Sequence, residues 1–276
     1  MDKAVIIGVY DFLGFHFCRM FLEQGMEVAG LHIEHHGTGY FLEEKRMEIG
    51  RNANFEEHLL QEYSWPSGEL DDVVIIFDYY DLFVTRREKN FICTSSFEKF
   101  LAEKKSSQIL GVFLFPVQFL CECGFANEKR HADLFLQLVE HENLTIKKFY
   151  LPTVYGPWQS EEFTFQQHFL SGKKELSKAA RNNREWLWDA IYVDDTVRSV
   201  WNICLNKHGD DEFILTGGKE NQWMECARFL SLPVGERSGD PPVLKNAFTV
   251  EVKAQRHVEA ALKLQRLHVD RLKSQI

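Results

Sequence analysis

The sequence predicts an α/β fold, a doubly wound parallel sheet with a small C-terminal lobe. In the first half, short β-rich runs alternate with longer helical stretches. This alternation is typical of a parallel sheet whose right-handed crossovers place helices on both faces. The strand-like runs are also continuously apolar, as expected for strands that are buried on both faces. At 276 residues the chain is long enough to bury such a core.

The spacing of apolar residues gives the individual elements of the first half. We expect strands at residues 3–9, 27–33, 73–77, 109–115 and 146–151. We expect helices at residues 13–25, 55–63, 90–105 and 126–142. In the first helix, one apolar stripe precedes the helix stop at Gly25, and this stripe consists of Leu13, Phe17, Met20 and Phe21.

The character of the sequence changes after about residue 156. A polar, irregular stretch leads to the strand-like DAIYV and to a helix that begins near Asp194. We therefore expect an α/β domain at residues 1–156 and a smaller lobe at 157–276, interleaved with it. From Thr249 onward, apolar residues at helical spacing predict an amphipathic helix, which could pack on its own chain or bind a partner.

Composition limits the partners of the protein. The net charge of −9 argues against nucleic-acid and membrane-surface partners, because attraction to phosphate needs a basic excess. The opening MDKAVIIG resembles neither a secretory signal nor a membrane span, so we expect a cytoplasmic protein. His32 and Glu34 share a strand face, but no distant ligand set accompanies them, and we expect no metal site.

Three segments, in the same order, resemble the extended short-chain dehydrogenase/reductase family, which includes NAD-dependent epimerases and dehydratases of nucleotide sugars. They are VIIGVYDFLGFHFCRMFLEQGMEVAGL, FYLPTVYGPWQ and WDAIYVDDTVRSVWNICLN. FILTGG at 213–218 fits the next strand of the family. The resemblance covers roughly residues 3 to 230, and it implies a Rossmann-like nicotinamide-binding domain that carries a small substrate domain.

The resemblance places a set of residues against the cofactor: Gly8, Tyr10, Asp11, Phe12, Leu13, Gly14, Glu34, Phe77 and Lys129. Gly8 would permit the tight turn, and Gly14 the close packing of helix on strand. Asp11 replaces the middle glycine of the family pattern. A carboxylate about 5 Å from a phosphate would repel it by roughly 3 kcal/mol at an effective dielectric of about 20. We therefore expect weak or absent binding of NAD or NADP, although a side chain that swings outward would relieve this repulsion.

Asp11 also has a structural interpretation, because an aspartate at a helix N-terminus can cap free backbone N–H groups and stabilise an empty turn. Glu34 stands about where an acidic residue would bond the adenosine ribose, which favours NAD over NADP if either binds. Phe77, Asp78 and Tyr79 would crowd the end of the fourth strand of the family fold.

The catalytic positions of the family have also changed. Family chemistry uses a serine or threonine and a Tyr-x-x-x-Lys pair. CGFANEKRHADLF aligns Phe125 with the tyrosine and Lys129 with the lysine, and Phe115 and Pro116 stand near the hydroxyl position. Loss of a positioned acid–base group costs about 10² to 10⁴ in rate. Lys129 is therefore the one remaining catalytic candidate; it either keeps a ribose contact or is simply solvated.

The leading hypothesis is a pseudoenzyme that keeps the fold and acts as a ligand-sensing or interaction protein. The alternative is a divergent NAD(P)-dependent epimerase, dehydratase or reductase that acts on a sugar nucleotide or another small polar substrate. Its relocated acid would be Tyr79, Tyr80 or Tyr155. A third hypothesis is a partner-binding subunit. The resemblance also implies a possible homodimer through helices 90–105 and 126–142.

Overall fold

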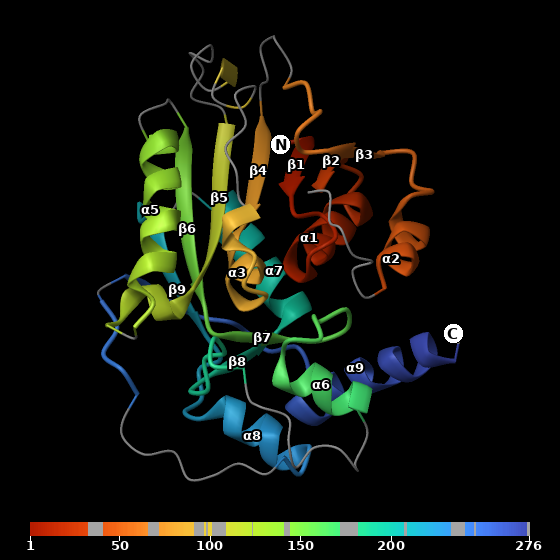
Figure 1. The fold of residues 1–276 in the computed structure, drawn as a ribbon, viewed down its shortest axis with the longest axis vertical. Coiled ribbons are helices and arrows are strands. Elements are labelled where there is room, and N and C mark those ends of the chain that lie inside the picture. Colours follow the sequence, from red (N-terminus) through yellow and green to blue (C-terminus); the bar gives the residue numbers. More distant parts are fainter. Residues whose placement is uncertain are drawn as a thin grey trace. The chain divides into compact units, whose positions relative to one another are not determined.

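The computed structural model contains two compact units, each described by itself below. Unit 1 comprises Met1–Phe115 and Gly124–Phe149, and unit 2 comprises Pro116–Cys123 and Tyr150–Ile276. Within them the structure describes residues 1–32, 41–65, 72–90, 97, 99–100, 109–122, 124–140, 144–171, 182–206, 209–232, 241–245 and 247–274. Figure 1 shows the elements of both units.

The sheet of unit 1 has the strand order β3-β2-β1-β4-β5-β6. The neighbouring pairs from β3 through β5 are all parallel. The predicted α/β class with a parallel sheet is therefore confirmed. The strands are β1 (Lys3–Ile7), β2 (Glu27–His32), β3 (Phe55–Leu59), β4 (Val73–Asp78), β5 (Ile109–Pro116) and β6 (Thr145–Leu151).

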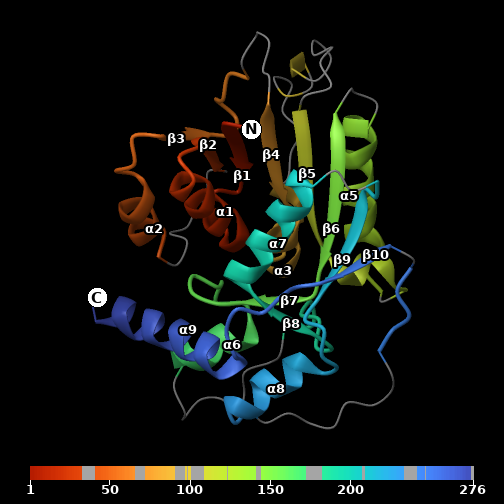
Figure 2. The ribbon, with the colours of Figure 1, turned by 180° about the vertical axis from the view of Figure 1, so that it is seen from behind.

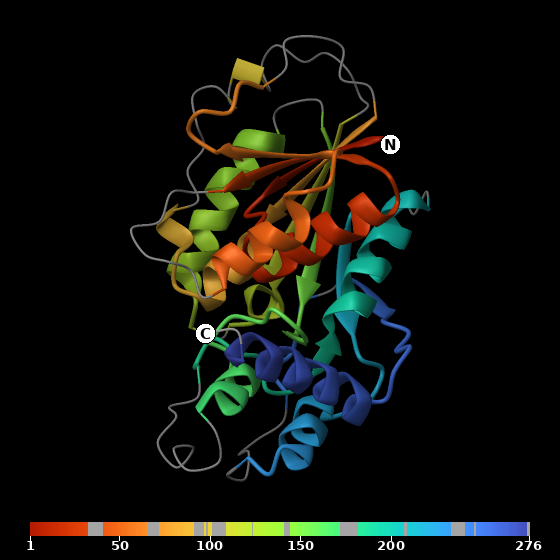
Figure 3. The same ribbon diagram turned by 90° about the vertical axis from the view of Figure 1, so that its right-hand side faces the viewer.

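Helices cover both faces of this sheet. They are α1 (Phe12–Glu23), α2 (Leu42–Ile49), α3 (Tyr79–Val84), the short 3-10 helix η1 (Glu88–Asn90) and α5 (Ala126–Glu140). Figure 3 shows α1 and α5 on opposite sides of the strands. The alternation of side chains along the strands explains this arrangement. Ile6 packs under Gly14 of α1, whereas Phe77, paired in register with Ile7, contacts Phe135 of α5.

The predicted helix at 55–63 is wrong, because residues 55–59 form β3. The sequence FEEHL is an edge strand that pairs in parallel with β2, and its partly polar composition hides the strand pattern. Phe55 fills the space above Gly30, where any larger side chain would collide with its ring. The helix of this region is α2, which the sequence analysis missed. Most of the predicted helix at 90–105 lies outside the described residues.

The described residues of unit 2 combine two parallel strand pairs with helices (Figure 2). The strands are β7 (Thr153–Tyr155), β8 (Ala190–Tyr192), β9 (Glu212–Thr216) and β10 (Phe248–Glu251). The helices are η2 (Val117–Leu120), α6 (Thr164–Ser171), α7 (Val193–Leu205), α8 (Gln222–Phe229) and α9 (Val258–Lys273). The predicted terminal helix is confirmed, but it begins at Val258. The segment from Thr249 to Glu251 is a strand instead, because its β-branched residues pair with β9.

Helix α9 packs against α6 and α8 of its own unit. Its buried side is Ala261, Leu262, Gln265, Val269 and Leu272. The docking interpretation of this helix is therefore confirmed, and its exposed large apolar residues are Leu264 and Leu267. Within the described part of the chain, no helix combines the length and the apolar character that a membrane crossing requires.

Candidate functional site

The candidate site is the turn between β1 and α1. Gly8 adopts the left-handed region, with φ of +89°, and its carbonyl oxygen accepts the Asp11 N–H at 2.8 Å. A side chain at Gly14 would collide with that same carbonyl oxygen. Both glycines are therefore required by the backbone, for the reasons that the sequence predicts. This tight turn aims the first N–H groups of α1 toward the end of β4.

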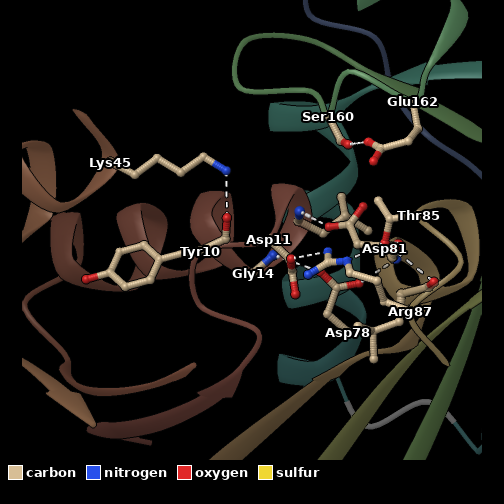
Figure 4. A network of polar contacts seen from close by, with 12 residues as sticks. Tyr10, Asp11, Gly14, Lys45, Asp78, Asp81, Thr85, Arg87, Ser160 and Glu162 are labelled. Carbon is tan, nitrogen blue, oxygen red and sulfur yellow. Dashed lines mark hydrogen bonds and ion pairs between the residues drawn. The ribbon is translucent and has the colours of Figure 1, made fainter. Parts of the chain in front are cut away.

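Two buried carboxylates already occupy these N–H groups (Figure 4). The Leu13 N–H donates to Asp81 Oδ2 at 2.7 Å, and the Gly14 N–H donates to Asp78 Oδ2 at 3.1 Å. Both aspartates are only 1% exposed. A helix N-terminus leaves its first N–H groups unsatisfied and carries a partial positive charge, so it attracts anions. In this protein the anions come from the chain itself.

The local sequence DYYD explains where these carboxylates point. Asp78 ends β4 and caps α3, because its Oδ1 accepts the Asp81 N–H at 3.1 Å. Asp and Asp three residues apart resemble a capping box, which fixes the first turn of a helix. The cap holds Asp81 against the start of α1. From the sequence, Asp78 was expected only to crowd the end of the strand and Asp81 was not predicted, although their spacing was a usable signal.

Asp11 does not cap α1, so the capping interpretation of this residue is wrong. Its side chain bonds no N–H of α1 among the described residues. Instead, Arg87 Nη2 lies 2.5 Å from Asp11 Oδ1, and Arg87 Nε donates to Thr85 Oγ1 at 2.7 Å. Arg87 also neutralises the charge that was expected to repel a phosphate. The sequence gives no signal for this pair, because the two residues are 76 positions apart.

Lys45 of α2 adds a second cation beneath the turn. Its Nζ donates to the Tyr10 carbonyl oxygen at 2.6 Å, and its side chain is buried. Burial lowers the pKa of Lys45 to about 8, while the negative charges of Asp11 and Asp81 oppose this change. The turn therefore sits among three carboxylates and two cations, and all five belong to unit 1.

The Tyr10 side chain is also fixed within unit 1. Its hydroxyl donates to Glu57 Oε2 at 2.8 Å, and the Arg46 guanidinium lies over its ring, 5.4 Å from the centroid. His32 Nε2 is 3.0 Å from Glu57 Oε1. These contacts join the turn to β2, β3 and α2. Glu34, the predicted ribose ligand, lies outside the described residues.

The positions aligned with the catalytic tyrosine and serine carry apolar rings that pack within unit 1. Phe125 meets Phe83 edge to face, with ring centroids 5.0 Å apart. Phe115 is 2% exposed and lies 5.9 Å from the ring of Tyr79. Lys129 is half-buried on the first turn of α5. The structure thus brings the aligned residues to the start of α5 and the end of β5, with rings in place of hydroxyl groups.

The three tyrosines considered as relocated acids are all buried. Tyr79, Tyr80 and Tyr155 are 2%, 3% and 2% exposed. The Tyr79 hydroxyl donates to the Glu128 carbonyl oxygen at 2.9 Å, which places this phenol at the first turn of α5. Burial raises the pKa of Tyr155. Tyr79 is the one of the three with a described contact to the helix that carries Lys129.

Phe77 belongs to the core of unit 1. It has no exposed surface, and its ring stacks on Phe113 at a centroid distance of 4.3 Å. Phe135 of α5 completes this aromatic cluster. The ring therefore offers no surface to a cofactor, contrary to the expectation from the resemblance. The Phe12 and Leu13 side chains are similarly buried, at 2% and 0% exposure.

Comparison with known proteins identifies the fold. No protein-family model and no curated protein matches the sequence. Among solved structures, UDP-glucuronic acid 4-epimerase from Bacillus cereus, in complex with UDP-glucuronic acid and NAD, is similar, with a TM-score of 0.67 and 13% identity over 98% of this chain and 99% of that one.

Two further structures agree with this result. dTDP-glucose 4,6-dehydratase from Bacillus anthracis, in complex with NAD, gives a TM-score of 0.65 and 16% identity, covering 99% of this chain and 98% of its own. UDP-glucose 4-epimerase from Thermotoga maritima gives a TM-score of 0.62 and 17% identity, covering 98% of this chain and 99% of its own. The fold of this chain is therefore that of the NAD-dependent nucleotide-sugar epimerases and dehydratases of the extended short-chain dehydrogenase/reductase type, as its motifs predict.

Proposed function

We propose that this protein keeps the epimerase fold without the usual Ser/Tyr/Lys chemistry, and that it acts as a ligand-sensing or interaction protein. It binds NAD or NADP weakly or not at all. The observation that carries this proposal is the hydrogen bond from the Leu13 N–H to Asp81. In dinucleotide-binding folds, the N–H groups at the start of this helix are the donors for the pyrophosphate.

The residues of the turn do not fit a pyrophosphate in this arrangement. A phosphate that reached Leu13 and Gly14 would have to displace Asp81 and Asp78, both of which are buried. The cations do not remove this conflict, because Arg87 is paired with Asp11 and Lys45 with a backbone carbonyl. Displacement of a well-bonded internal anion lowers the affinity for an external one.

The aligned catalytic positions support the same proposal. The residue aligned with the tyrosine that would move a proton is Phe125, and Phe115 and Pro116 stand near the position aligned with the hydroxyl residue. Each loss of a positioned acid–base group costs about 10² to 10⁴ in rate. Lys129 cannot replace both groups, because in the family pattern it acts through the tyrosine.

One contact favours the alternative of a divergent epimerase, dehydratase or reductase. The Tyr79 hydroxyl reaches the first turn of α5, bonded to the carbonyl oxygen of the residue before Lys129. A phenol there could serve as a relocated acid beside the lysine. Cofactor-dependent turnover that falls at least about 100-fold in Tyr79→Phe and in Lys129→Ala would favour this alternative over the pseudoenzyme.

Calorimetric titration with NAD, NADH, NADP and NADPH tests the main proposal. We expect wild-type affinities weaker than about 1 mM, which corresponds to less than about 4 kcal/mol of binding free energy. Asp81→Ala should bind at least about tenfold more tightly, because the competing carboxylate is gone. Asp11→Gly should change little, because the Asp11 carboxylate does not cover the α1 donors.

The exposed Asp72, which precedes β4, provides the control as Asp72→Asn, because asparagine tolerates its left-handed backbone, with φ of +63°. Micromolar binding to the wild-type protein would contradict the proposal. If Asp81→Ala also failed to bind, Asp81 would not be the group that blocks the site.

A further inference from the structure

The carboxylates at the start of α1 leave one oxygen without a hydrogen-bond donor. Asp78 accepts an N–H at each of its oxygens, from Gly14 and from Asp81 itself. Asp81 Oδ2 accepts the Leu13 N–H, but Asp81 Oδ1 receives no donor from the described residues, although the residue is only 1% exposed. An unsatisfied buried carboxylate oxygen is costly, so it indicates a missing hydrogen.

A proton supplies that hydrogen. The neighbouring N–H groups of Leu13 and Gly14 each bind one of the two side chains, so the carboxylates of Asp81 and Asp78 meet at the start of α1. Two neighbouring carboxylates repel each other when both are ionised, and a proton on one of them allows it to donate to the other. Burial raises the pKa of both groups. The pair therefore holds one proton and keeps one negative charge at the start of α1.

We propose that Asp78 and Asp81 form a binding site for one shared proton, and that this proton locks the β1–α1 turn in its closed arrangement. A phosphate-bearing ligand that displaces Asp81 from Leu13 must release the proton. This inference rests on the proposed function, since it explains how the turn is held closed. It also goes further, because it makes ligand entry depend on pH.

The charged groups around the pair shape this dependence. Asp11, from the turn, destabilises a second negative charge on the pair, and its effect is moderated by its ion pair with Arg87. Lys45, from α2, stabilises the charge on Asp81. Lys45 loses its own proton near a pKa of about 8. Below that pH Lys45 stays protonated, so the pH dependence there reports the protonation of the aspartate pair and not that of Lys45.

The sign of the effect follows from proton counting. The closed turn holds one proton more than an open turn, in which both carboxylates are solvated and ionised at neutral pH. Rising pH therefore favours opening, by at most about tenfold per pH unit. Lys45 has the opposite effect on folding stability: above its pKa of about 8, the unfolded chain binds more protons than the folded protein, so rising pH stabilises the fold.

The first test needs no ligand. Asp81→Asn keeps an amide oxygen for the Leu13 N–H and offers an NH₂ group to an ionised Asp78, so no shared proton is needed. Between about pH 5 and pH 7 the wild-type midpoint of urea unfolding should fall with rising pH relative to that of Asp81→Asn. Asp72→Asn, an exposed change before the same strand, should follow the wild type. Parallel curves for wild type and Asp81→Asn would overturn the proposal.

Infrared spectroscopy reports the proton directly. At neutral pH the wild-type protein should show the carbonyl band of a protonated carboxyl group, and this band should disappear in both Asp78→Asn and Asp81→Asn. Other buried acids, such as Glu185, give a band that these variants leave unchanged. A band that is unchanged by both substitutions would contradict the shared proton.

A second test uses NADH as the probe. Below pH 8, the affinity of the wild type for NADH should increase by up to about tenfold for each unit of increasing pH. About one proton should be released for each NADH bound, and calorimetry in buffers of different ionisation enthalpy measures this release. NADH binding to Asp81→Asn should release no proton. Tight, pH-independent NADH binding to the wild type would refute the proposed function and the lock together. Weak NADH binding, together with parallel pH dependences of urea unfolding in the wild type and Asp81→Asn, would refute the shared proton but leave the proposed function intact.

Discussion

The helices α1 and α6 both begin at a buried carboxylate of their own unit, but they use it differently. In unit 2, Glu185 accepts the Thr164 N–H at 3.2 Å on one oxygen and 3.1 Å on the other, and it also accepts the Thr164 hydroxyl. In unit 1, α1 receives two aspartates, one of which keeps an oxygen without a donor among the described residues.

The difference separates a structural cap from a closed binding site. One carboxylate with a donor at each oxygen is sufficient to satisfy the start of α6. A second carboxylate beside the first is unnecessary for capping α1, and it costs electrostatic free energy unless a proton is shared. The start of α1 is therefore held by two carboxylates that repel each other when both are ionised, whereas the start of α6 is held by one carboxylate with a donor at each oxygen.

The largest effect is expected where the turn allows no side chain. Gly14→Ala would push a methyl group into the Gly8 carbonyl oxygen and separate α1 from β1, at a cost above about 4 kcal/mol. Urea unfolding or the yield of folded protein measures it. Gly124→Ala is the control, because no described atom lies within 4 Å of the added carbon, and only its φ of +86° is strained, at about 1 kcal/mol. Equal losses in both variants would show that Gly14 has no special role.

The next effect concerns pH and α6. Burial raises the pKa of Glu185 to about 7, so the folded protein binds its proton more tightly than the unfolded chain does. Stability should therefore fall as the pH rises from about 4.5 to about 7, by up to about 3 kcal/mol relative to Glu185→Gln. Denaturant unfolding across this range gives the difference. A wild type that gains stability relative to Glu185→Gln would reverse the predicted sign.

A direct comparison of the two helix starts gives a smaller difference. Glu185→Ala leaves the Thr164 N–H and hydroxyl without their acceptor, at about 2 to 3 kcal/mol. Asp81→Ala should cost only about 1 kcal/mol, because the lost Leu13 bond is offset by relief of the repulsion with Asp78. Asp72→Asn and Glu220→Ala, both at exposed positions, serve as controls in the same unfolding assay, and asparagine tolerates the left-handed backbone of residue 72. A larger loss of unfolding free energy in Asp81→Ala than in Glu185→Ala would contradict this prediction, because the carboxylate at α1 would then be the more stabilising one.

The smallest effect is expected for the ion pair of the turn. Asp11 and Arg87 have side chains 15% and 27% exposed, so their pair is partly screened. Asp11→Asn should change the free energy of unfolding by less than about 1 kcal/mol. If Asp11→Asn were as destabilising as Glu185→Ala in the same assay, the pair would be an essential part of the turn.

The elements predicted correctly are those whose apolar pattern is continuous in the sequence. The apolar runs of β1, β4 and β5 and the stripes of α1 and α5 are continuous in sequence, so their elements were found. The edge strand β3 was mistaken for a helix because its polar residues satisfy no strand pattern without the pairing to β2. Gly8 and Gly14 were predictable from their spacing. The bonds of Leu13 to Asp81 and of Asp11 to Arg87 were not, since 68 and 76 positions separate the partners.

The central claim is that the chain's own carboxylates occupy the phosphate donors of α1. The most direct measurement is the NMR response of the Leu13 and Gly14 amides to NADH, in the wild type and in Asp81→Ala at the same pH. We predict that NADH leaves both wild-type amide resonances in place at micromolar concentrations and shifts them in Asp81→Ala. Micromolar NADH that shifts both amides in the wild-type protein would contradict the claim.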